Sequence, residues 1–377
     1  MVSLGWAIKG SFRLVREGWA RCGARASGRP LHGYIGWAGH GNSGDDSMFT
    51  AARRLCPDVQ WTQVLPGKRT LSLMAALGLN EPGYLASAAL GGGTLIGHDM
   101  YLHAVKTLQK KGLSLWAFGT GVGSCGWSAE PNAELREWAE PLTQFKGIGV
   151  RGPLSRDSLE ALGVPRVRIV GDLALSLALE APVQAPPTPC IGLNLSVPQT
   201  QAGSDGINGM VRALTEVARR RLRQGCRILP FAMARSDIPP LKRLVAALGL
   251  DRCRVFYSTK ADAVIDHLSR CTTVIGVRLH SAVFACCAGV SPVMLGYRTK
   301  CLDFMSSMGL EPRHVPFLHM TENAIYNRIE SLSAPESVTY SDRCEVLRRA
   351  HQWKAAQIGF LQEMVGPKAR GDTECMR

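Results

Sequence analysis

Short apolar runs rich in β-branched residues alternate along this chain with longer segments in which apolar residues recur at helical spacing. Short runs bounded by glycine or polar residues predict buried strands, and the longer segments predict amphipathic helices. In the first half the predicted strands are His32–Ala38, Val59–Leu65, Leu85–Leu90, Leu113–Phe118, Gly147–Arg151 and Val167–Val170, and the predicted helices include Ala51–Leu55, Ala133–Phe145 and Pro153–Leu162. This alternation is typical of a mostly parallel sheet with helices on both faces.

The alternation restarts after a proline-rich stretch, Ala181–Pro189, which is typical of a linker. The second half predicts strands at Cys190–Leu195, Arg227–Phe231, Arg254–Phe256, Thr273–Val277 and Pro292–Leu295, and helices at Ile207–Arg223, Pro239–Leu248, Ala261–Ser269, Leu279–Ala288 and Ser341–Val365. We therefore expect an α/β protein of two Rossmann-like lobes that face each other across a cleft. Its predicted parts are a basic helix (1–30), an N-terminal domain (31–180), a linker (181–189), a C-terminal domain (190–340) and a C-terminal helix and tail (341–377).

Composition narrows the class of protein. The 377 residues are 46% hydrophobic and 20% charged, as in an ordinary globular protein, and no stretch approaches the roughly 18 to 20 apolar residues of a membrane span. The twelve cysteines are scattered without a C-x-x-C pair, which favours free thiols in a reducing compartment over a disulfide framework or a zinc site. We expect a cytoplasmic protein without a signal peptide or a metal site.

A formal net charge of +14 predicts an anionic partner. No nucleic-acid-binding signature is present, so a phosphorylated substrate or an anionic membrane surface explains the charge better. The first thirty residues combine apolar residues at helical spacing with six basic residues, Lys9, Arg13, Arg16, Arg21, Arg25 and Arg29. Such a basic amphipathic helix either lies on the inner face of a membrane or docks on the protein's own body, and both interpretations stay open.

The richest candidate chemistry follows the apolar run Val274–Val277. Arg278, His280 and Ser281 come directly after this predicted strand, where a helix begins. Strand ends that lead into helices bind anions in α/β proteins, because free backbone N–H groups and the helix dipole point there. An arginine fork suits carboxylate or phosphate, and a histidine exchanges protons near neutral pH. The segment predicts an anion site with a proton donor.

A glycine-rich turn, Gly39–Gly44, follows the first predicted strand and formally matches a dinucleotide fingerprint. That interpretation needs an acid about twenty residues later, and Asp58 comes too early. Asn42 offers a donor to a ligand. Asp45 and Asp46 either start the next helix or hold and deprotonate a sugar hydroxyl.

Several pieces in this order resemble the polysaccharide pyruvyl transferase family. The pieces are Gly41-Asn42-x-Gly44-Asp45-Asp46, Gly91-Gly92-Gly93, Arg151-x-x-x-Ser155, Gly171-Asp172, Arg278-Leu279-His280 and Tyr297-x-x-Lys300, within residues 35 to 310. The resemblance implies a glycosyltransferase-B-like fold and transfer of the enolpyruvyl group of phosphoenolpyruvate, which forms a cyclic pyruvate ketal on a sugar and releases phosphate. It also implies substrate-binding and catalytic roles for Arg278 and His280, and a second basic position at Lys300.

The chain departs from the family pattern in two places, and at one of them Gly171-Asp172-Leu173-Ala174 replaces the more usual Asp-Pro-Ala. An arginine commonly follows the first strand of the second half, but Asn194-Leu195-Ser196 stands here, and Arg235 is the candidate replacement. Arg151 and Ser155 are interpreted as helix-start residues, since Gly152-Pro153 resembles a helix entry. The full predicted site has His280 as general acid, Asp45 or Asp46 as base, and a substrate-binding set of Arg278, Lys300, Tyr297, Asn42, Gly92, Gly93, Arg235 and Ser281.

Three functions fit these residues. The leading prediction is pyruvyl transfer to a sugar of an exopolysaccharide or of its lipid-linked precursor, with phosphoenolpyruvate as donor and no cofactor. A nucleotide-sugar glycosyltransferase of the same architecture is the alternative. A non-catalytic family member that keeps the fold is the third, because of the absent arginine.

Overall fold

A computed structural model describes residues 30–80, 82, 84–123, 133–184, 186, 188–197, 204–250, 252–334 and 339–366. The predicted basic helix (1–30, apart from its last residue) and the tail beyond residue 366 lie outside the described residues. None of the described helices is both long and apolar enough to cross a membrane.

The N-terminal lobe is built on a seven-stranded parallel sheet with the order β2-β1-β3-β5-β6-β7, in which β4 pairs with β5. Its strands are β1 (Leu31–Ile35), β2 (Gln60–Val64), β3 (Ser87–Leu90), β4 (Gly93–Ile96), β5 (Leu115–Val122), β6 (Gly147–Val150) and β7 (Val167–Ile169). Its helices are α2 (Ser43–Leu55), α3 (Lys68–Ala76), α4 (Asp99–Lys110), α5 (Ala133–Arg136), α6 (Ala139–Thr143), α7 (Pro153–Glu160) and the 3-10 turn η1 (Leu173–Leu177). The single helix predicted over 133–145 is wrong: Pro141 has no N–H to bond the carbonyl of Glu137, and the chain forms two short helices instead.

The C-terminal lobe repeats this plan on a six-stranded parallel sheet with the order β10-β9-β8-β11-β12-β13. Its strands are β8 (Cys190–Asn194), β9 (Arg227–Ala232), β10 (Phe256–Tyr257), β11 (Thr273–Gly276), β12 (Pro292–Leu295) and β13 (His314–Val315). Its helices are α8 (Ser204–Arg223), α9 (Ile238–Ala247), α10 (Ala261–Ser269), α11 (Leu279–Cys287), α12 (Thr299–Ser307) and α13 (Glu322–Leu332), with 3-10 turns η2 (Arg235–Asp237), η3 (Glu311–Arg313) and η4 (Phe317–His319). The proline-rich stretch lies between η1 and β8. Because each lobe is built on its own parallel sheet, the predicted fold class of two parallel α/β lobes is confirmed.

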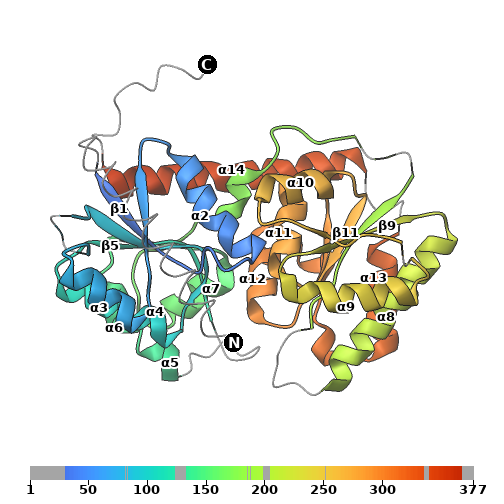
Figure 1. Ribbon diagram of the computed structural model, residues 1–377, viewed down its shortest axis with the longest axis horizontal. Helices are drawn as coiled ribbons and strands as arrows, with labels where there is room; N and C mark the ends of the chain where they lie inside the picture. Colours follow the sequence, from blue (N-terminus) through green and yellow to red (C-terminus); the bar gives the residue numbers. More distant parts are fainter. Residues whose placement is uncertain are drawn as a thin grey trace.

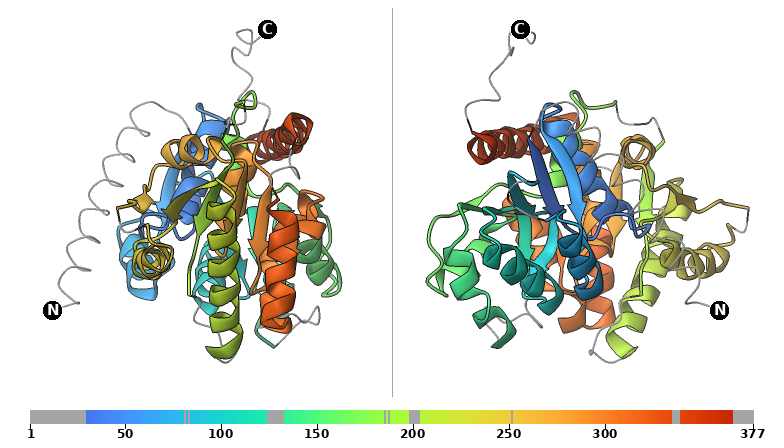
Figure 2. Two further views of the ribbon diagram at one scale, coloured as in Figure 1. Left: turned by 90° about the vertical axis from the view of Figure 1, so that its right-hand side faces the viewer. Right: turned by 60° about the vertical axis from the view of Figure 1, so that its left-hand side comes forward.

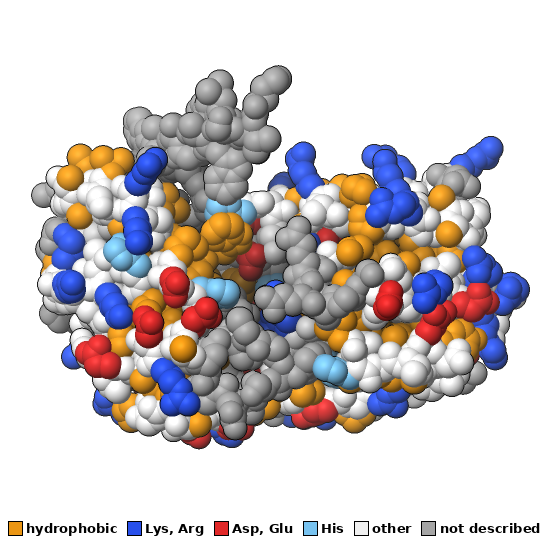
Figure 3. Space-filling model, turned by 90° about the horizontal axis from the view of Figure 1, so that it is seen from below, with side chains coloured by type: hydrophobic (Ala, Val, Ile, Leu, Met, Phe, Trp, Pro, Cys, Tyr) orange, Lys and Arg blue, Asp and Glu red, His pale blue; other side chains and the backbone are white. Residues whose placement is uncertain are grey.

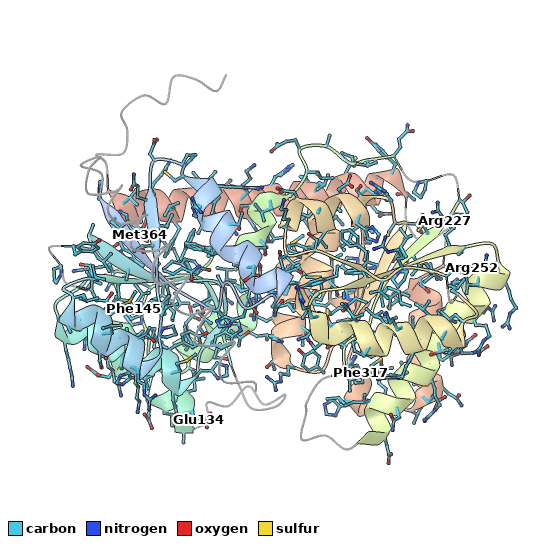
Figure 4. The ribbon with its side chains drawn as sticks, in the orientation of Figure 1. Glu134, Phe145, Arg227, Arg252, Phe317 and Met364 are labelled. Carbon is cyan, nitrogen blue, oxygen red and sulfur yellow. The ribbon has the colours of Figure 1, made fainter. Side chains whose placement is uncertain are left out.

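The long helix α14 (Tyr340–Val365) lies across both lobes, which stand side by side (Figures 1 and 2). At its start the guanidinium of Arg343 donates to carbonyl oxygens of the C-terminal lobe, including that of Cys271 at 2.8 Å. Near its end Gln357 donates to the carbonyl of Asp172 at 2.9 Å, and Phe360 stacks on Phe118 of β5 with ring centroids 5.7 Å apart. Side chains fill the space between each sheet and its helices, and Met364 marks where α14 ends on the N-terminal lobe (Figure 4). The apolar core is therefore continuous across the lobe boundary.

Candidate functional site

Loops that follow the carboxyl ends of strands in both lobes meet at the lobe boundary. A backbone bridge joins Asn42, after β1, to Ala234, after β9. The N–H of Ser43 donates to the carbonyl of Met233 at 2.9 Å, and the hydroxyl of Tyr257 donates to the carbonyl of Gly41 at 2.8 Å. Ligands of open α/β sheets bind outside the carboxyl ends of the strands. Figure 3 shows acidic, basic, histidine and hydrophobic side chains gathered around a hollow between the lobes.

Arg278 caps α11 at the end of β11 and is held firmly by its own lobe. Its guanidinium donates to the carboxylate of Asp237 through Nη2 at 2.8 Å and Nε at 3.1 Å, and its backbone N–H donates to Asn194 at 3.0 Å. Burial alone would lower the pKa of Arg278, but the hydrogen bond and charge of Asp237 outweigh it and the pKa is raised. Asp237 is itself buried and accepts from two backbone N–H groups. Arg278 is thus a fixed, permanent cation, and its side chain keeps 29% of its surface exposed.

His280, in the first turn of α11, packs against the N-terminal lobe. A side chain on Gly44 would overlap its imidazole, so the glycine at the start of α2 makes room for it. Its Nε2 lies 3.7 Å from Oδ2 of Asp172 and makes no hydrogen bond among the described residues. Burial lowers the pKa of His280 to about 4; the charges of Arg151, Lys300 and Arg278 add to this effect and Asp172 opposes it. The imidazole is therefore neutral near pH 7.

The two neighbouring acids of α2 differ in what they contact. Asp45 accepts a hydrogen bond of 2.5 Å from the amide of Asn42, and burial raises its pKa to about 6 against the opposing charges of Lys300 and Arg278. Asp46 instead accepts the backbone N–H of Gly39 and so holds the loop after β1. Asp45 therefore faces the cations and exchanges a proton near neutral pH, which favours it over Asp46 as the predicted base.

Lys300, in the first turn of α12, supplies a second cation beside Tyr297. Its Nζ lies 5.3 Å from the centroid of the Tyr297 ring. Its charge lowers the pKa values of Asp45, His280 and His98, so the ammonium faces all three. In the part of the chain that the structure describes, no carboxylate forms an ion pair with Lys300. It is free to meet an anion.

Two further polar residues, Arg151 after β6 and Asp172 after β7, complete the cluster from the N-terminal lobe. Arg151 is fully buried, and its Nε and Nη1 have no hydrogen-bond partner among the described residues. Asp172 is also fully buried; its Oδ1 caps the N–H of Ala174 at 3.0 Å, and its Oδ2 is unbonded. Buried polar atoms are nearly always partnered, so these atoms together with Nε2 of His280 indicate a place for a polar ligand or water.

Sequence reasoning interpreted Arg151 as helix-start chemistry and gave Asp172 no role in the site. Both residues directly follow predicted strands of the parallel sheet, and that position is the signal that could have found them.

A buried contact between the lobes fixes the helix that carries Lys300. The carboxylate of Asp303, one turn further along α12, accepts the hydroxyl of Ser155 at 2.6 Å and its N–H at 3.1 Å. Its Oδ2 lies 3.7 Å from Nε of Arg151. Ser155 is thus a helix-start residue, as predicted, and it also anchors α12 to α7 across the boundary.

The other predicted residues occupy different places. The hydroxyl of Ser281 donates to the carbonyl of Arg278 at 2.5 Å and so closes its own turn. The N–H of Gly92 donates to the hydroxyl of Tyr34 at 3.1 Å; a side chain there would overlap Met48. Gly93 has a φ of +110°, which favours glycine. Arg235 is exposed beside the bridge at Ala234, and its side chain makes no hydrogen bond or ion pair with the described residues.

Comparisons with known proteins identify a family and a fold. The described residues contain no group of three or more side chains suited to bind a metal ion. The family model for polysaccharide pyruvyl transferase matches residues 44–299. A search of curated proteins found no match.

Solved structures share the fold at low sequence identity. A putative UDP-N-acetylglucosamine 2-epimerase from Listeria monocytogenes is similar with a TM-score of 0.60 and 12% identity, over 91% of this chain and 98% of that one. The S. aureus MnaA–UDP structure has a TM-score of 0.61 and 7% identity, over 89% and 96%. Anabaena HepE in complex with UDP-glucose has a TM-score of 0.58 and 9% identity, over 89% and 99%. These likenesses confirm the glycosyltransferase-B-like architecture.

Proposed function

Because this chain belongs to the polysaccharide pyruvyl transferase family, we propose that it transfers a pyruvyl group from phosphoenolpyruvate to a sugar of a polysaccharide or of its lipid-linked precursor. The observation that carries the choice of donor is the set of unbonded, buried polar atoms on Arg151, Asp172 and His280. Phosphoenolpyruvate brings a phosphate and a carboxylate on three carbons, so its binding needs several cations close together. Arg151, Lys300 and Arg278 supply them, with charge-assisted hydrogen bonds as the source of affinity.

The charges of the donor also set the protonation state of His280. The cations that lower the pKa of this imidazole are the groups that the donor's negative charges neutralise. Donor binding therefore raises the pKa of His280, and Asp172, 3.7 Å away, favours the protonated form. The histidine becomes an acid when the donor is present.

In the proposed reaction, His280 gives a proton to C3 of the enol, which becomes the methyl group, and C2 becomes an oxocarbenium-like centre. One sugar hydroxyl adds to C2 while Asp45 takes its proton. A second hydroxyl then displaces phosphate from C2. Of the two hydroxyl protons, one replaces the proton that His280 gave and the other protonates the departing phosphate. The products are therefore the cyclic ketal and inorganic phosphate.

An assay with two donors tests this proposal. The protein is incubated with acceptor glycans and either phosphoenolpyruvate or a panel of UDP-sugars, and released phosphate or UDP is measured together with the mass of the glycan. We expect phosphate and a ketal-bearing glycan with phosphoenolpyruvate alone. Release of UDP with a glycosylated product would support the glycosyltransferase alternative, which is motivated by the UDP in the similar MnaA structure and the UDP-glucose in the similar HepE structure.

Thermal shift adds a readout that needs no acceptor. Phosphoenolpyruvate is expected to raise the melting temperature more than inorganic phosphate, pyruvate or UDP, because it alone presents both anionic groups at once. Stabilisation by neither phosphoenolpyruvate nor UDP would favour a non-catalytic member of the family.

A further inference from the structure

Trp37 is an exposed aromatic residue of the loop between β1 and α2, the loop that also carries Asn42. It lies two residues beyond β1, in the loop that leads to Asp45, and 38% of its surface is exposed. Its ring lies flat on that of His40, with centroids 3.9 Å apart and an interplanar angle of 13°. A single exposed apolar side chain is ordinary on a protein surface. A tryptophan stacked on a histidine, in the loop that leads to Asp45, is a formed aromatic surface.

The loop that carries Trp37 is fixed on both sides of the lobe boundary. Asp46 accepts the N–H of Gly39, and the hydroxyl of Tyr257 donates to the carbonyl of Gly41 from the C-terminal lobe. Gly39 and Gly41 have φ values of +85° and +75°, which turn the chain sharply back toward the start of α2. The indole is therefore held at a set position relative to the first turn of α2, where Asp45 lies.

The surface around this loop separates two kinds of chemistry. Cations for an anionic donor lie just before α11, on α12 and just after β6, at Arg278, Lys300 and Arg151. The aromatic pair lies on the β1–α2 loop, next to the carboxylates. Figure 3 likewise shows hydrophobic and histidine side chains beside acidic ones at the hollow between the lobes. A small, highly charged donor has no apolar face to place on an indole, but a pyranose ring has one.

We propose that Trp37, supported by His40, is the stacking platform for the acceptor sugar. The C–H face of a hexopyranoside would cover the indole, and its hydroxyls would then point toward Asp45 and Asn42. Aromatic side chains are suited to such contacts because they offer a large rigid area at small entropic cost. This inference rests on the proposed function for the identity of the donor, but the platform requires only that the acceptor is a sugar.

Steady-state kinetics on Trp37→Ala and Trp37→Phe test the platform. Trp37→Ala is expected to raise the acceptor KM about tenfold through lost ring contact, with the Kd for phosphoenolpyruvate unchanged and kcat altered much less. Trp37→Phe keeps an aromatic face and should recover most of the loss. Leu77→Ala, another exposed apolar side chain at the end of α3, is the matched control and should change none of these constants. An unchanged acceptor KM in Trp37→Ala would overturn the platform and leave the pyruvyl transfer proposal standing.

A binding measurement separates this inference from the reaction itself. Saturation-transfer NMR is recorded with methyl β-galactopyranoside, methyl β-glucopyranoside and methyl α-mannopyranoside on the wild type and on Trp37→Ala. Loss of sugar signal in the variant supports the platform, even where phosphoenolpyruvate gives no turnover and the proposed function fails. Equal signals in both proteins, or no signal from any of the three sugars with the wild type, would show that Trp37 is no sugar platform.

Discussion

Each lobe brings one arginine toward the same site, and the two residues are held in opposite ways. Arg278 of the C-terminal lobe donates to Asp237 through two nitrogens, so its guanidinium already has a carboxylate partner within the protein. Arg151 of the N-terminal lobe is more deeply buried, yet Nε and Nη1 are unbonded and its nearest carboxylate oxygen, on Asp303, lies 3.7 Å away. A guanidinium with its partners in place is a structural element that also carries charge. A buried guanidinium that keeps a long hydrogen bond to Thr94 through Nη2 and leaves two other nitrogens unbonded indicates a place where a polar ligand binds.

We call Arg278 and its neighbours in the turn between β11 and α11 the C-terminal corner of the site, and Arg151 and Asp172 the N-terminal corner. His280 connects the two corners, and its substitution has the largest expected effect. It belongs to the motif of Arg278 but packs against Gly44 and faces Asp172 of the other lobe. His280→Gln removes the proton donor and keeps the size and polarity of the side chain. We expect kcat to fall by about 10²- to 10⁴-fold, the usual contribution of a general acid, with the melting temperature nearly unchanged. Phosphate release under donor saturation measures this.

The matched control is His103→Gln on α4, which is expected to leave kcat as it is. A His280→Gln enzyme with wild-type turnover would remove the histidine from the chemistry and leave Asp45, whose pKa is raised to about 6, as the candidate for proton exchange.

Substituting each arginine by glutamine separates the two corners. Arg151→Gln should weaken phosphoenolpyruvate binding about 10- to 100-fold, since a hydrogen bond to a charged group contributes about 1.5–3 kcal/mol. Its stability should stay within about 1 kcal/mol of wild type, because Nε of Arg151 lies 3.7 Å from Asp303, beyond hydrogen-bond distance, and Asp303 keeps both bonds from Ser155. Arg278→Gln leaves buried Asp237 without its cation and should lower the free energy of unfolding by about 1.5–3 kcal/mol.

Isothermal titration with phosphoenolpyruvate and urea unfolding measure the two quantities on both variants. If Arg151→Gln lost stability and kept donor affinity, Arg151 would be structural and the contrast between the corners would be wrong.

The sequence predicted the C-terminal corner well because its residues are consecutive. Arg278 and His280 follow one apolar run, and the periodicity that marks β12 (Pro292–Leu295) and α10 (Ala261–Ser269) gave their observed bounds. Helix α12 was not among the predicted elements, although the motif already named its Lys300; nine residues of mixed polarity carry little periodic signal.

The N-terminal corner depends on contacts that no local pattern contains. Asp303 bonds Ser155 across 148 positions of sequence, and only the docking of the lobes brings Arg151 and Asp172 beside His280. A single sequence indicates which side chains end strands, but it does not indicate which of them lose their partners on burial. That property depends on the packed structure, and it is the property that distinguishes Arg151.

The acidic limb of the pH profile tests whether Asp45, and not Asp46, is the catalytic base. Because Asp45 must be deprotonated to act as base and its pKa is about 6, kcat/KM should fall about tenfold per pH unit below that value. Asp45→Asn should lose this limb along with most activity, and Asp46→Asn should keep its midpoint.

The raised pKa of Asp45 also means that the native state binds more protons than the unfolded state between about pH 4 and 6. The wild type should therefore lose stability relative to Asp45→Asn as pH rises through that window; an opposite slope in pH-dependent unfolding would contradict burial as the cause of the shift.

The smallest effect is expected for a solvent-exposed ion pair between the two lobes. Arg54 of α2 and Asp262 of α10 form two hydrogen bonds of 2.7 Å across the boundary, but their side chains are 53% and 62% exposed. An exposed pair contributes about 0.2–1 kcal/mol and is screened by salt. A double-mutant cycle with Arg54→Ala and Asp262→Ala, measured by urea unfolding at low and high salt, should give a coupling in that range that shrinks with salt, and kinetics close to wild type. A coupling above about 2 kcal/mol, or a loss of donor affinity in either variant, would mean that surface contacts also set the geometry of the site, and the buried bond from Ser155 to Asp303 would no longer suffice to explain how Lys300 is placed.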